Sequence, residues 1–365
     1  MPGKGKLTSL LLAGTVLLSG CSSMLERSYM VVTAHPEHPA AADDSNVLKA
    51  ETYQDLVNDV LYFVNQGVEH GAIRLTNYPR DVEADLNSAC LEVARDAPIG
   101  AYAVDFIEHD CTRVVQYYEA NIHITYRRTL EQIQSIKTVT GSSAVRRVLQ
   151  EKLTRFAPEA VLQVSYFTED EDYISALIRQ AYYDTPAAAL GMPEYTISLY
   201  PDQGRERIVE ILLTYPAPAE ELRRMSQLLL QQADQLSASL LGQAGPEALQ
   251  EIFDLLRQRV SPAPDGEGPT AYAALLENRA DSEGVALAFQ LLCQTAGLDS
   301  TVVRGFRDGR AHFWNVCALP SGQHRHVDAS AADGFLLTDS DAEAMGYVWD
   351  RDEIPVCSDS GKEAG

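Results

Sequence analysis

The chain has few basic residues, few cysteines and a single long apolar run, and each shortage excludes some functions. Its 29 lysines and arginines face 52 aspartates and glutamates over 365 residues, which gives a formal net charge of −23. A surface this acidic repels phosphate backbones and anionic headgroups, so nucleic acid and a bare lipid surface are not expected partners. The apolar run lies within the first twenty residues, and no other run is long enough to span a membrane.

Cysteine is scarce, and its spacing matches no zinc-binding pattern. Apart from Cys21 near the N-terminus, the cysteines are Cys90, Cys111, Cys293, Cys317 and Cys357. In an exported protein one pair could oxidise, and Cys90–Cys111 is the local candidate. We expect most of the five to be buried small apolar residues instead. No metal and no other cofactor is predicted.

The N-terminal segment has the features of a secretory signal peptide in their usual order. Lys4 and Lys6 give a short positive region, residues 7–18 are apolar, and Leu18-Ser19-Gly20-Cys21 follows. This last string resembles the bacterial lipobox, whose cysteine is lipid-modified and becomes the new N-terminus. The resemblance implies that residues 1–20 are removed. It also implies that acyl chains such as palmitate on Cys21 anchor a lipoprotein to the extracytoplasmic face of a bacterial cell membrane.

Residues 21–50 have little periodicity and are predicted to be a linker. His35 and His38 within it could bind a metal, although two histidines in a flexible tether more often bind nothing. The next segment, residues 51–216, shows a weak internal repeat of about ninety residues.

The first copy of the repeat is predicted to contain two helices, a turn at Pro98 and Gly100, and three strands. Its helices cover 51–64 and 82–95, and its strands cover 72–78, 102–108 and 113–126. The second copy has helices at 144–156 and 171–183 and strands at 160–167, 195–200 and 207–215. Tyr102 and Tyr195 are expected to start equivalent strands. Alternation in the strands predicts sheets with one face packed against helices. No catalytic constellation stands out, so a scaffold or binding module is predicted.

Residues 219–260 are predicted to be a helical connector, because apolar residues recur there every three or four positions. Gly245 breaks the run, and Pro246 can begin a second helix. A turn-rich boundary at 261–266 precedes a last domain, residues 268–357. The predicted fold class is therefore α+β, with two repeated α-β-α-β-β modules, a helical connector and a C-terminal domain.

The C-terminal domain carries three ordered motifs. Glu283-Gly284 opens an amphipathic helix, His312-x-Trp314-Asn315 lies on a predicted strand, and Val327-Asp328 lies on the next. In this order they resemble the transglutaminase-like superfamily, which shares a papain-like catalytic layout. The resemblance spans residues 269–357. It implies that His312 and Asp328 are the catalytic histidine and its orienting aspartate, and it places Ser282 where the family has its nucleophilic cysteine.

The family chemistry depends on a thiolate, which a helix N-terminus and a nearby imidazolium favour. A serine hydroxyl forms no such ion pair, so His312 would have to act as a general base during attack. Ser282 could instead simply cap the helix, and Asp281 beside it would repel an oxyanion. The prediction is a catalytically degenerate domain, a pseudoenzyme that binds peptide or wall components at the cell surface. The alternative is a Ser282–His312–Asp328 hydrolase or acyltransferase acting on peptide-type substrates.

Other residues near these motifs have side chains that can take part in chemistry. His324, His326 and Asp328 share one face of a strand and, with His312, could bind a metal. Strand histidines facing solvent are the favoured interpretation. Cys293 lies too far along its helix to replace Ser282 and is expected in the core, and Cys317 is expected to be packed rather than reactive.

Overall fold

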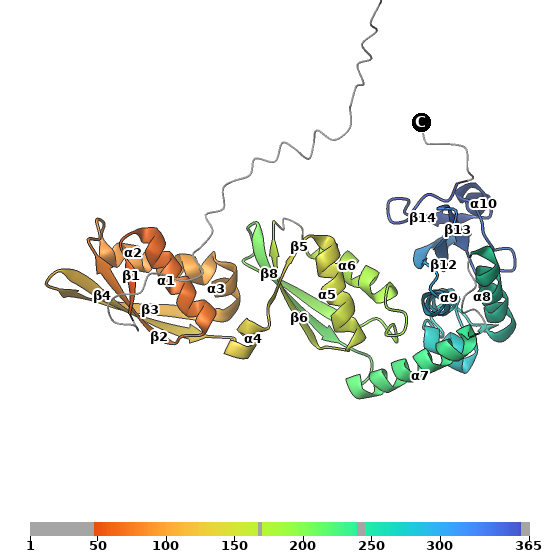
Figure 1. The fold of residues 1–365 in the computed structure, drawn as a ribbon, viewed down its shortest axis with the longest axis horizontal. Coiled ribbons are helices and arrows are strands. Elements are labelled where there is room, and N and C mark those ends of the chain that lie inside the picture. Colours follow the sequence, from red (N-terminus) through yellow and green to blue (C-terminus); the bar gives the residue numbers. More distant parts are fainter. Residues whose placement is uncertain (1–46, 167–169, 239–244, 359–365) are drawn as a thin grey trace, which may run out of the picture. The chain divides into compact units, whose positions relative to one another are not determined.

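A computed structural model of the protein describes residues 47–166, 170–238 and 245–358. The predicted signal peptide, Cys21, His35 and His38 lie outside the described residues. Within the described ranges, no helix is both long and apolar enough to cross a bilayer. The described chain mixes helices and β-sheets (Figure 1). Three of the sheets have four strands and one has two.

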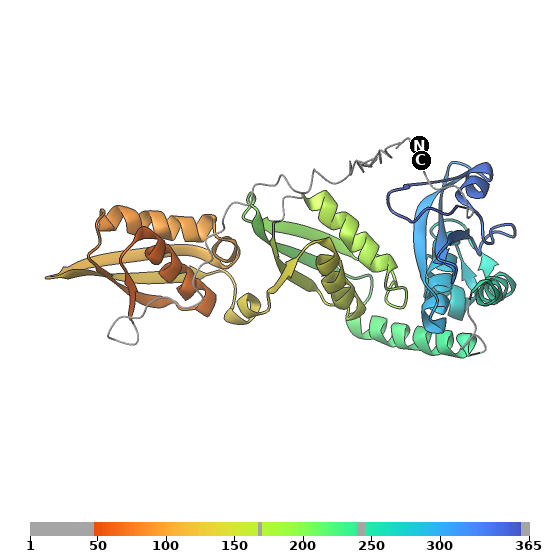
Figure 2. The same cartoon turned by 45° about the horizontal axis from the view of Figure 1, so that its top comes forward.

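The first module is a four-stranded sheet with its helices on one face (Figure 2). Its elements are β1 (Val47–Ala50), α1 (Tyr53–Gln66), β2 (His70–Thr76), α2 (Val82–Arg95), α3 (Pro98–Ala103), β3 (Val104–Val114) and β4 (Tyr117–Tyr126). Thr52 begins α1 with a capping box, and the Asp81 side chain caps α2. Ile73 and Ile122 are fully buried beneath these helices, while residues on either side of them face the open side of the sheet.

The second module has the same strand order and the same strand directions as the first. Its sheet runs β5-β6-β8-β7, where the first module has β1-β2-β4-β3. In each module the first pair of strands is parallel and the other two pairs are antiparallel. After a short helix α4 (Leu130–Gln134), its elements are β5 (Lys137–Thr140), α5 (Ser142–Thr154), β6 (Glu159–Ser165), α6 (Glu171–Tyr183), β7 (Glu194–Tyr200) and β8 (Glu206–Thr214).

The predicted α-β-α-β-β unit is wrong at its start, because each module opens with a strand. Strands β1 and β5 are four residues long, too short for an alternating pattern, and their parallel pairing with β2 and β6 defines them. The last four residues of the predicted 21–50 linker therefore belong to the first sheet. The turn predicted at Pro98 is helix α3, and Tyr102 lies in that helix whereas Tyr195 lies in β7. These two tyrosines do not start equivalent strands.

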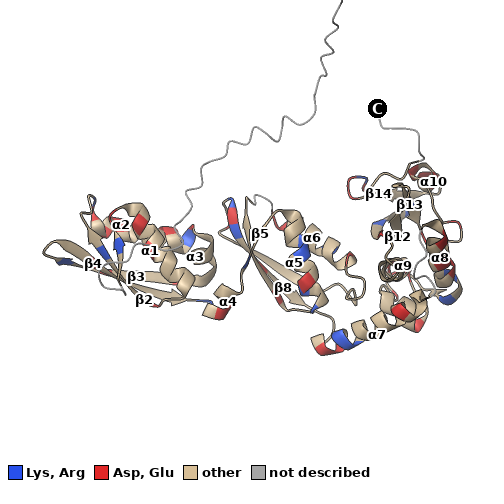
Figure 3. Ribbon diagram, in the orientation of Figure 1, with Lys and Arg blue, Asp and Glu red and all other residues tan. Residues whose placement is uncertain are grey.

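Two helices lead into the C-terminal domain, α7 (Ala219–Ser237) and α8 (Pro246–Arg259), and Pro246 is the first residue of α8. Acidic and basic residues are interspersed along the chain, α7 included (Figure 3). The domain continues with β9 (Ser261–Pro262), a π-helical turn η1 (Ala273–Glu277), β10 (Arg279–Ala280), α9 (Ser282–Ala296), β11 (Ser300–Arg307), β12 (Arg310–Ala318), β13 (His324–Val327), α10 (Asp339–Ala344) and β14 (Tyr347–Trp349). Its sheet order is β13-β12-β11-β14, and every pair is antiparallel.

Helix α9 is the central element of this domain, buried on all sides from Gly284 to Cys293. Cys293 and Cys317 are fully buried, as predicted. A Cβ at Gly284 would lie 2.2 Å from the carbonyl oxygen of Gly268, so only glycine allows the loop to pass so close to the first turn of α9. Cys90 and Cys111 are free thiols, and the Cys90–Cys111 disulfide is not formed.

Candidate active site

His312 and Asp328 form a hydrogen-bonded pair. His312 lies on β12 and Asp328 directly follows β13, and the antiparallel pairing of Asn315 with Val327 brings the two strands together. The distance from His312 Nε2 to Asp328 Oδ2 is 2.7 Å. The structure therefore brings together two of the three residues predicted from the sequence.

Asp328 is 2% exposed, and several donors satisfy its carboxylate. Oδ1 accepts from the Ser330 N–H at 2.9 Å and from the Ser330 hydroxyl at 2.6 Å. Oδ2 accepts from the Tyr347 hydroxyl at 2.7 Å, and Arg307 Nη1 lies 3.5 Å away. Burial alone would raise the pKa of Asp328. The hydrogen bond and charge of His312, with those from Ser330 and Tyr347, outweigh burial and hold this pKa below its ordinary value.

Two aromatic rings fix the plane of the His312 imidazole. The Trp314 ring is stacked against it, with centroids 6.2 Å apart and an interplanar angle of 25°. The Tyr347 ring meets it edge-on at 5.9 Å. Because Nε2 is directed at Asp328, only Nδ1 of His312 is left to serve a nucleophile. The sequence motif identified His312 and Asp328, but it gave no signal for Tyr347 or Ser330 as their supports.

Ser282 is the first residue of α9 but not its cap. The cap is Asp281, whose Oδ1 accepts from the Gly284 N–H at 3.0 Å and whose Oδ2 accepts from the Gly266 N–H at 2.8 Å. The alternative in which Ser282 caps the helix is therefore wrong, because the Asp281 carboxylate accepts from both amides. The Ser282 hydroxyl oxygen instead accepts a hydrogen bond from the Phe313 N–H at 3.3 Å.

Ser282 and His312 line the same cavity, which has a volume of about 320 Å³. Asp281, Arg257 and Ser330 also line it. Among the residues that the structure describes, no hydrogen bond joins the Ser282 hydroxyl to the His312 ring. Ser282 and His312 thus line one cavity, but the His312 ring is not hydrogen-bonded to the Ser282 hydroxyl.

Glu283, the next residue of α9, accepts a hydrogen bond at 3.0 Å from the hydroxyl of Tyr183, the last residue of α6. Burial raises the pKa of Glu283 to about 7, the Tyr183 hydrogen bond opposes that rise, and the charge of Asp281 adds to it. The Tyr183 ring also packs against Phe313, with centroids 5.8 Å apart. The second module thus contacts the start of α9, which no local sequence pattern indicated.

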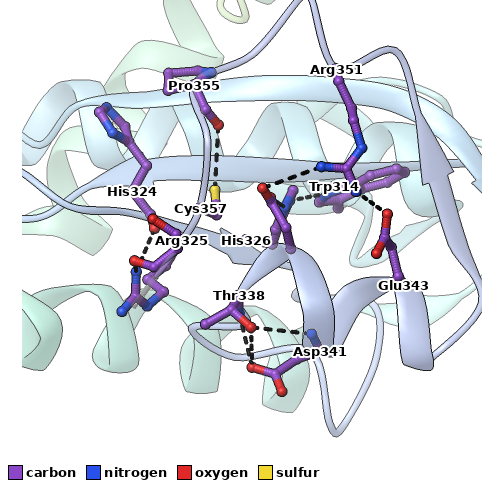
Figure 4. A network of polar contacts seen from close by, with 12 residues as sticks. Trp314, His324, Arg325, His326, Thr338, Asp341, Glu343, Arg351, Pro355 and Cys357 are labelled. Atoms are coloured by element: carbon purple, nitrogen blue, oxygen red, sulfur yellow. Dashed lines mark hydrogen bonds and ion pairs between the residues drawn. The ribbon is translucent and has the colours of Figure 1, made fainter. Parts of the chain in front are cut away.

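The alternative in which His324, His326 and Asp328 bind a metal together with His312 is not supported, because His326 belongs to a separate network (Figure 4). His326 is 1% exposed, so the expectation that it faces solvent is wrong. Donor atoms of His326, Asp339 and Cys357 all lie within 4.8 Å of one another, a spacing that suggests a metal site.

Hydrogen bonding argues against a metal there. Trp314 Nε1 donates to His326 Nδ1 at 2.9 Å, and an indole N–H can only donate. A neutral His326 therefore carries its proton on Nε2, which lies 2.9 Å from Asp339 Oδ1. Burial lowers the pKa of His326, which keeps the ring neutral. Both ring nitrogens of His326 are therefore occupied, so this histidine has no lone pair left for a cation.

No protein-family model matches the chain, and no curated protein is similar to it. The solved structures similar to part of the chain include a TGase and a putative cysteine protease. A structure described as a TGase is 12% identical over 48% of this chain and 52% of its own, with a TM-score of 0.28. A putative cysteine protease from Cytophaga hutchinsonii is 14% identical over 43% and 65%, with a TM-score of 0.27.

The periplasmic domain of TgpA from Pseudomonas aeruginosa is 15% identical over 39% of this chain and 66% of its own, with a TM-score of 0.23. The chain spans between half and two thirds of the length of these structures. The assignment of the site therefore rests on its own geometry.

Proposed function

We propose that residues 268–357 have a transglutaminase-like catalytic layout in which Ser282 replaces the nucleophilic cysteine. The supporting observation is the position of three groups. His312 and Asp328 are paired on neighbouring strands at 2.7 Å, and Ser282 begins the buried helix α9 on the same cavity. A nucleophile at a helix N-terminus with a histidine oriented by an acid is an arrangement that supports acyl transfer.

We propose further that this site binds peptide-type ligands, such as cell-wall components, without turning them over. The Ser282 hydroxyl accepts from the Phe313 N–H, and within the described residues it has no hydrogen bond to His312, so His312 does not withdraw its proton. Asp281 lines the same cavity, and its negative charge opposes that of an acyl-transfer intermediate. Both features reduce reactivity and leave the space for a ligand intact.

A Ser282-dependent hydrolase or acyltransferase is the second candidate, and the state of His312 favours it. Asp328 is fully supported by donors, and the ring plane is fixed so that Nδ1 is the free nitrogen. The amides of Ser282 and Glu283 lie in the first turn of α9, where backbone N–H groups have no acceptor within the helix. Such amides can stabilise an oxyanion.

One experiment separates the two functions. Wild-type protein, Ser282→Ala and His312→Ala are incubated with a panel of peptides and cell-wall stem peptides, and both cleavage and binding are measured. We expect binding without turnover in the wild type, and retained binding in Ser282→Ala. Turnover by the wild type that disappears in both variants would replace the binding function with the hydrolase.

The cellular location of the protein and the role of its N-terminal modules are also proposals. We propose that the protein is a lipoprotein anchored through Cys21 at the extracytoplasmic face of a bacterial membrane, supported by the order of charge, apolar run and cysteine in residues 1–21. We propose that the two N-terminal modules are a duplicated scaffold. Their shared strand order and strand directions support this.

A further inference from the structure

The open face of the first sheet carries a row of three side chains that can act as metal ligands. His70 on β2 stands directly opposite His123 on β4, and His123 stands directly opposite Glu108 on β3. Side chains of directly opposed residues lie on the same face of a sheet. Ile122, the neighbour of His123, is buried under the helices, so the row faces away from them, with His70 and Glu108 exposed.

The two imidazoles already meet at the nitrogens that would bind an ion. His70 Nδ1 and His123 Nδ1 are 2.8 Å apart, and the rings are nearly perpendicular, with centroids separated by 5.1 Å. One nitrogen must donate its proton to the other at this distance. Two Zn–N bonds in a tetrahedral site separate their nitrogens by about 3.3 Å. A slight opening of the pair lets an ion take the place of the shared proton.

The second nitrogen of His123 has the partner that a metal-binding histidine usually has. His123 Nε2 lies 3.5 Å from Asp110 Oδ2, and the Asn121 amide donates to Asp110 Oδ1 at 2.9 Å. When Nδ1 binds a metal, the ring proton sits on Nε2 and points at this carboxylate. A carboxylate behind the ring fixes the tautomer and strengthens the ligand. His326 differs, because its Nδ1 accepts a hydrogen bond from Trp314 and its Nε2–H donates one to Asp339.

We propose that His70, His123 and Glu108 form a binding site for a divalent transition-metal ion of the zinc type, with Asp110 orienting His123. Glu108 makes no ion pair with any residue in the described ranges, and its exposed side chain can turn toward the two nitrogens. Imidazole and carboxylate are donors that zinc accepts. Three protein ligands leave a fourth position for water or for a donor from another molecule. This site is independent of the cavity at Ser282.

Calorimetric titration of the purified chain with ZnCl2 tests the proposal, and the absorption spectrum with Co²⁺ reports the ligand geometry. We expect one ion per chain, and affinity at least about tenfold weaker in His70→Ala and in His123→Ala. Asp110→Asn should weaken binding by about tenfold, as loss of an outer partner does. The matched control is the double variant His35→Ala/His38→Ala, which should bind as the parent does.

Three results would overturn the proposal. They are no binding up to about 1 mM zinc, unchanged binding in both His70→Ala and His123→Ala, or loss of binding in the His35→Ala/His38→Ala control. The exposed positions of His70 and Glu108 predict that substitutions at these two residues leave the thermal unfolding of the metal-free protein unchanged. If His70→Ala destabilises the fold, Glu108→Gln provides the same test, because it keeps the side-chain volume and removes only the charged ligand.

Discussion

Placing a thiol at the nucleophile position measures directly how much of a catalytic environment survives there. In Ser282→Cys, the new sulfur lies at the first residue of a 15-residue helix and on the cavity that His312 lines. The helix N-terminus and an imidazolium both favour the thiolate. We expect the pKa of the introduced thiol to fall at least one unit below its free value of about 8.5, which corresponds to about 1.4 kcal/mol.

The native cysteines make the assay selective. Burial raises the pKa of Cys90 to about 12 and that of Cys357 to about 12, and it raises the pKa of Cys111. Cys293 and Cys317 are fully buried. Iodoacetamide alkylation between pH 5 and pH 9, followed by peptide mass spectrometry, should therefore report the introduced thiol well before these five.

A matched variant separates the helix from the histidine. Ser142 is also the first residue of a helix, α5, whose cap Gly141 has no side chain to form a capping bond. Ser142→Cys should show only the effect of a helix N-terminus, whereas Ser282→Cys should show that effect plus His312. Adding His312→Ala to Ser282→Cys should return its pKa toward the Ser142→Cys value. An introduced thiol at 282 that titrates no lower than the one at 142 would refute the reasoning.

The remaining predictions concern support of the site, pH dependence and anchoring. Tyr347→Phe removes the hydroxyl donor to the buried Asp328 carboxylate and should lower the free energy of unfolding by about 1.5–3 kcal/mol in urea denaturation near pH 7. The pKa of Asp328 is depressed in the fold, so the loss should shrink as the pH falls through that pKa. The pKa of Glu283 is raised to about 7, so its buried negative charge destabilises the folded protein above pH 7. Below pH 4 the group is protonated in the folded and the unfolded chain, and this effect disappears. Glu283→Gln should therefore stabilise the protein at pH 8 and flatten its stability between pH 4 and pH 7, and unchanged thermal-melting profiles would contradict this. Cys21→Ala should release the protein from membranes or leave it uncleaved, and unchanged fractionation and migration would contradict the anchor.

Sequence patterns predicted the parts of the site that lie in contiguous motifs. His312 and Asp328 follow from two short strings on adjacent strands, and their pairing depends only on strand order. The helix that Glu283-Gly284 opens is recognisable from its amphipathic pattern, and in the structure it runs from Ser282 to Ala296. The sequence leaves the capping residue open between Asp281 and Ser282, because serine and aspartate are equally good caps. Only the fold shows that Asp281 is held by the amide of Gly266, fifteen residues away in sequence.

Other features could not be predicted because distant residues create them. Tyr183 reaches Glu283 across 100 residues, and Tyr347 reaches Asp328 only after β14 pairs with β11. Strands β1 and β5 carry too few residues to show a period of two, and their parallel partners define them. Periodicity predicts which face of a helix or strand is buried, but it does not predict which residues that face contacts.

Trp314 explains why two nearby histidines in one domain have different chemistry. The Trp314 ring stacks on the His312 ring and makes no hydrogen bond to it. One His312 nitrogen therefore bonds to Asp328 and the other is left for the cavity. The Trp314 N–H donates to His326 and so fixes the proton of that ring on the side of Asp339. The Asp339 amide in turn donates to the Cys357 carbonyl at 2.7 Å. One buried indole thus orients the candidate base and also links it to the C-terminal segment, so the geometry of His312 depends on residues far outside the motif that identified it.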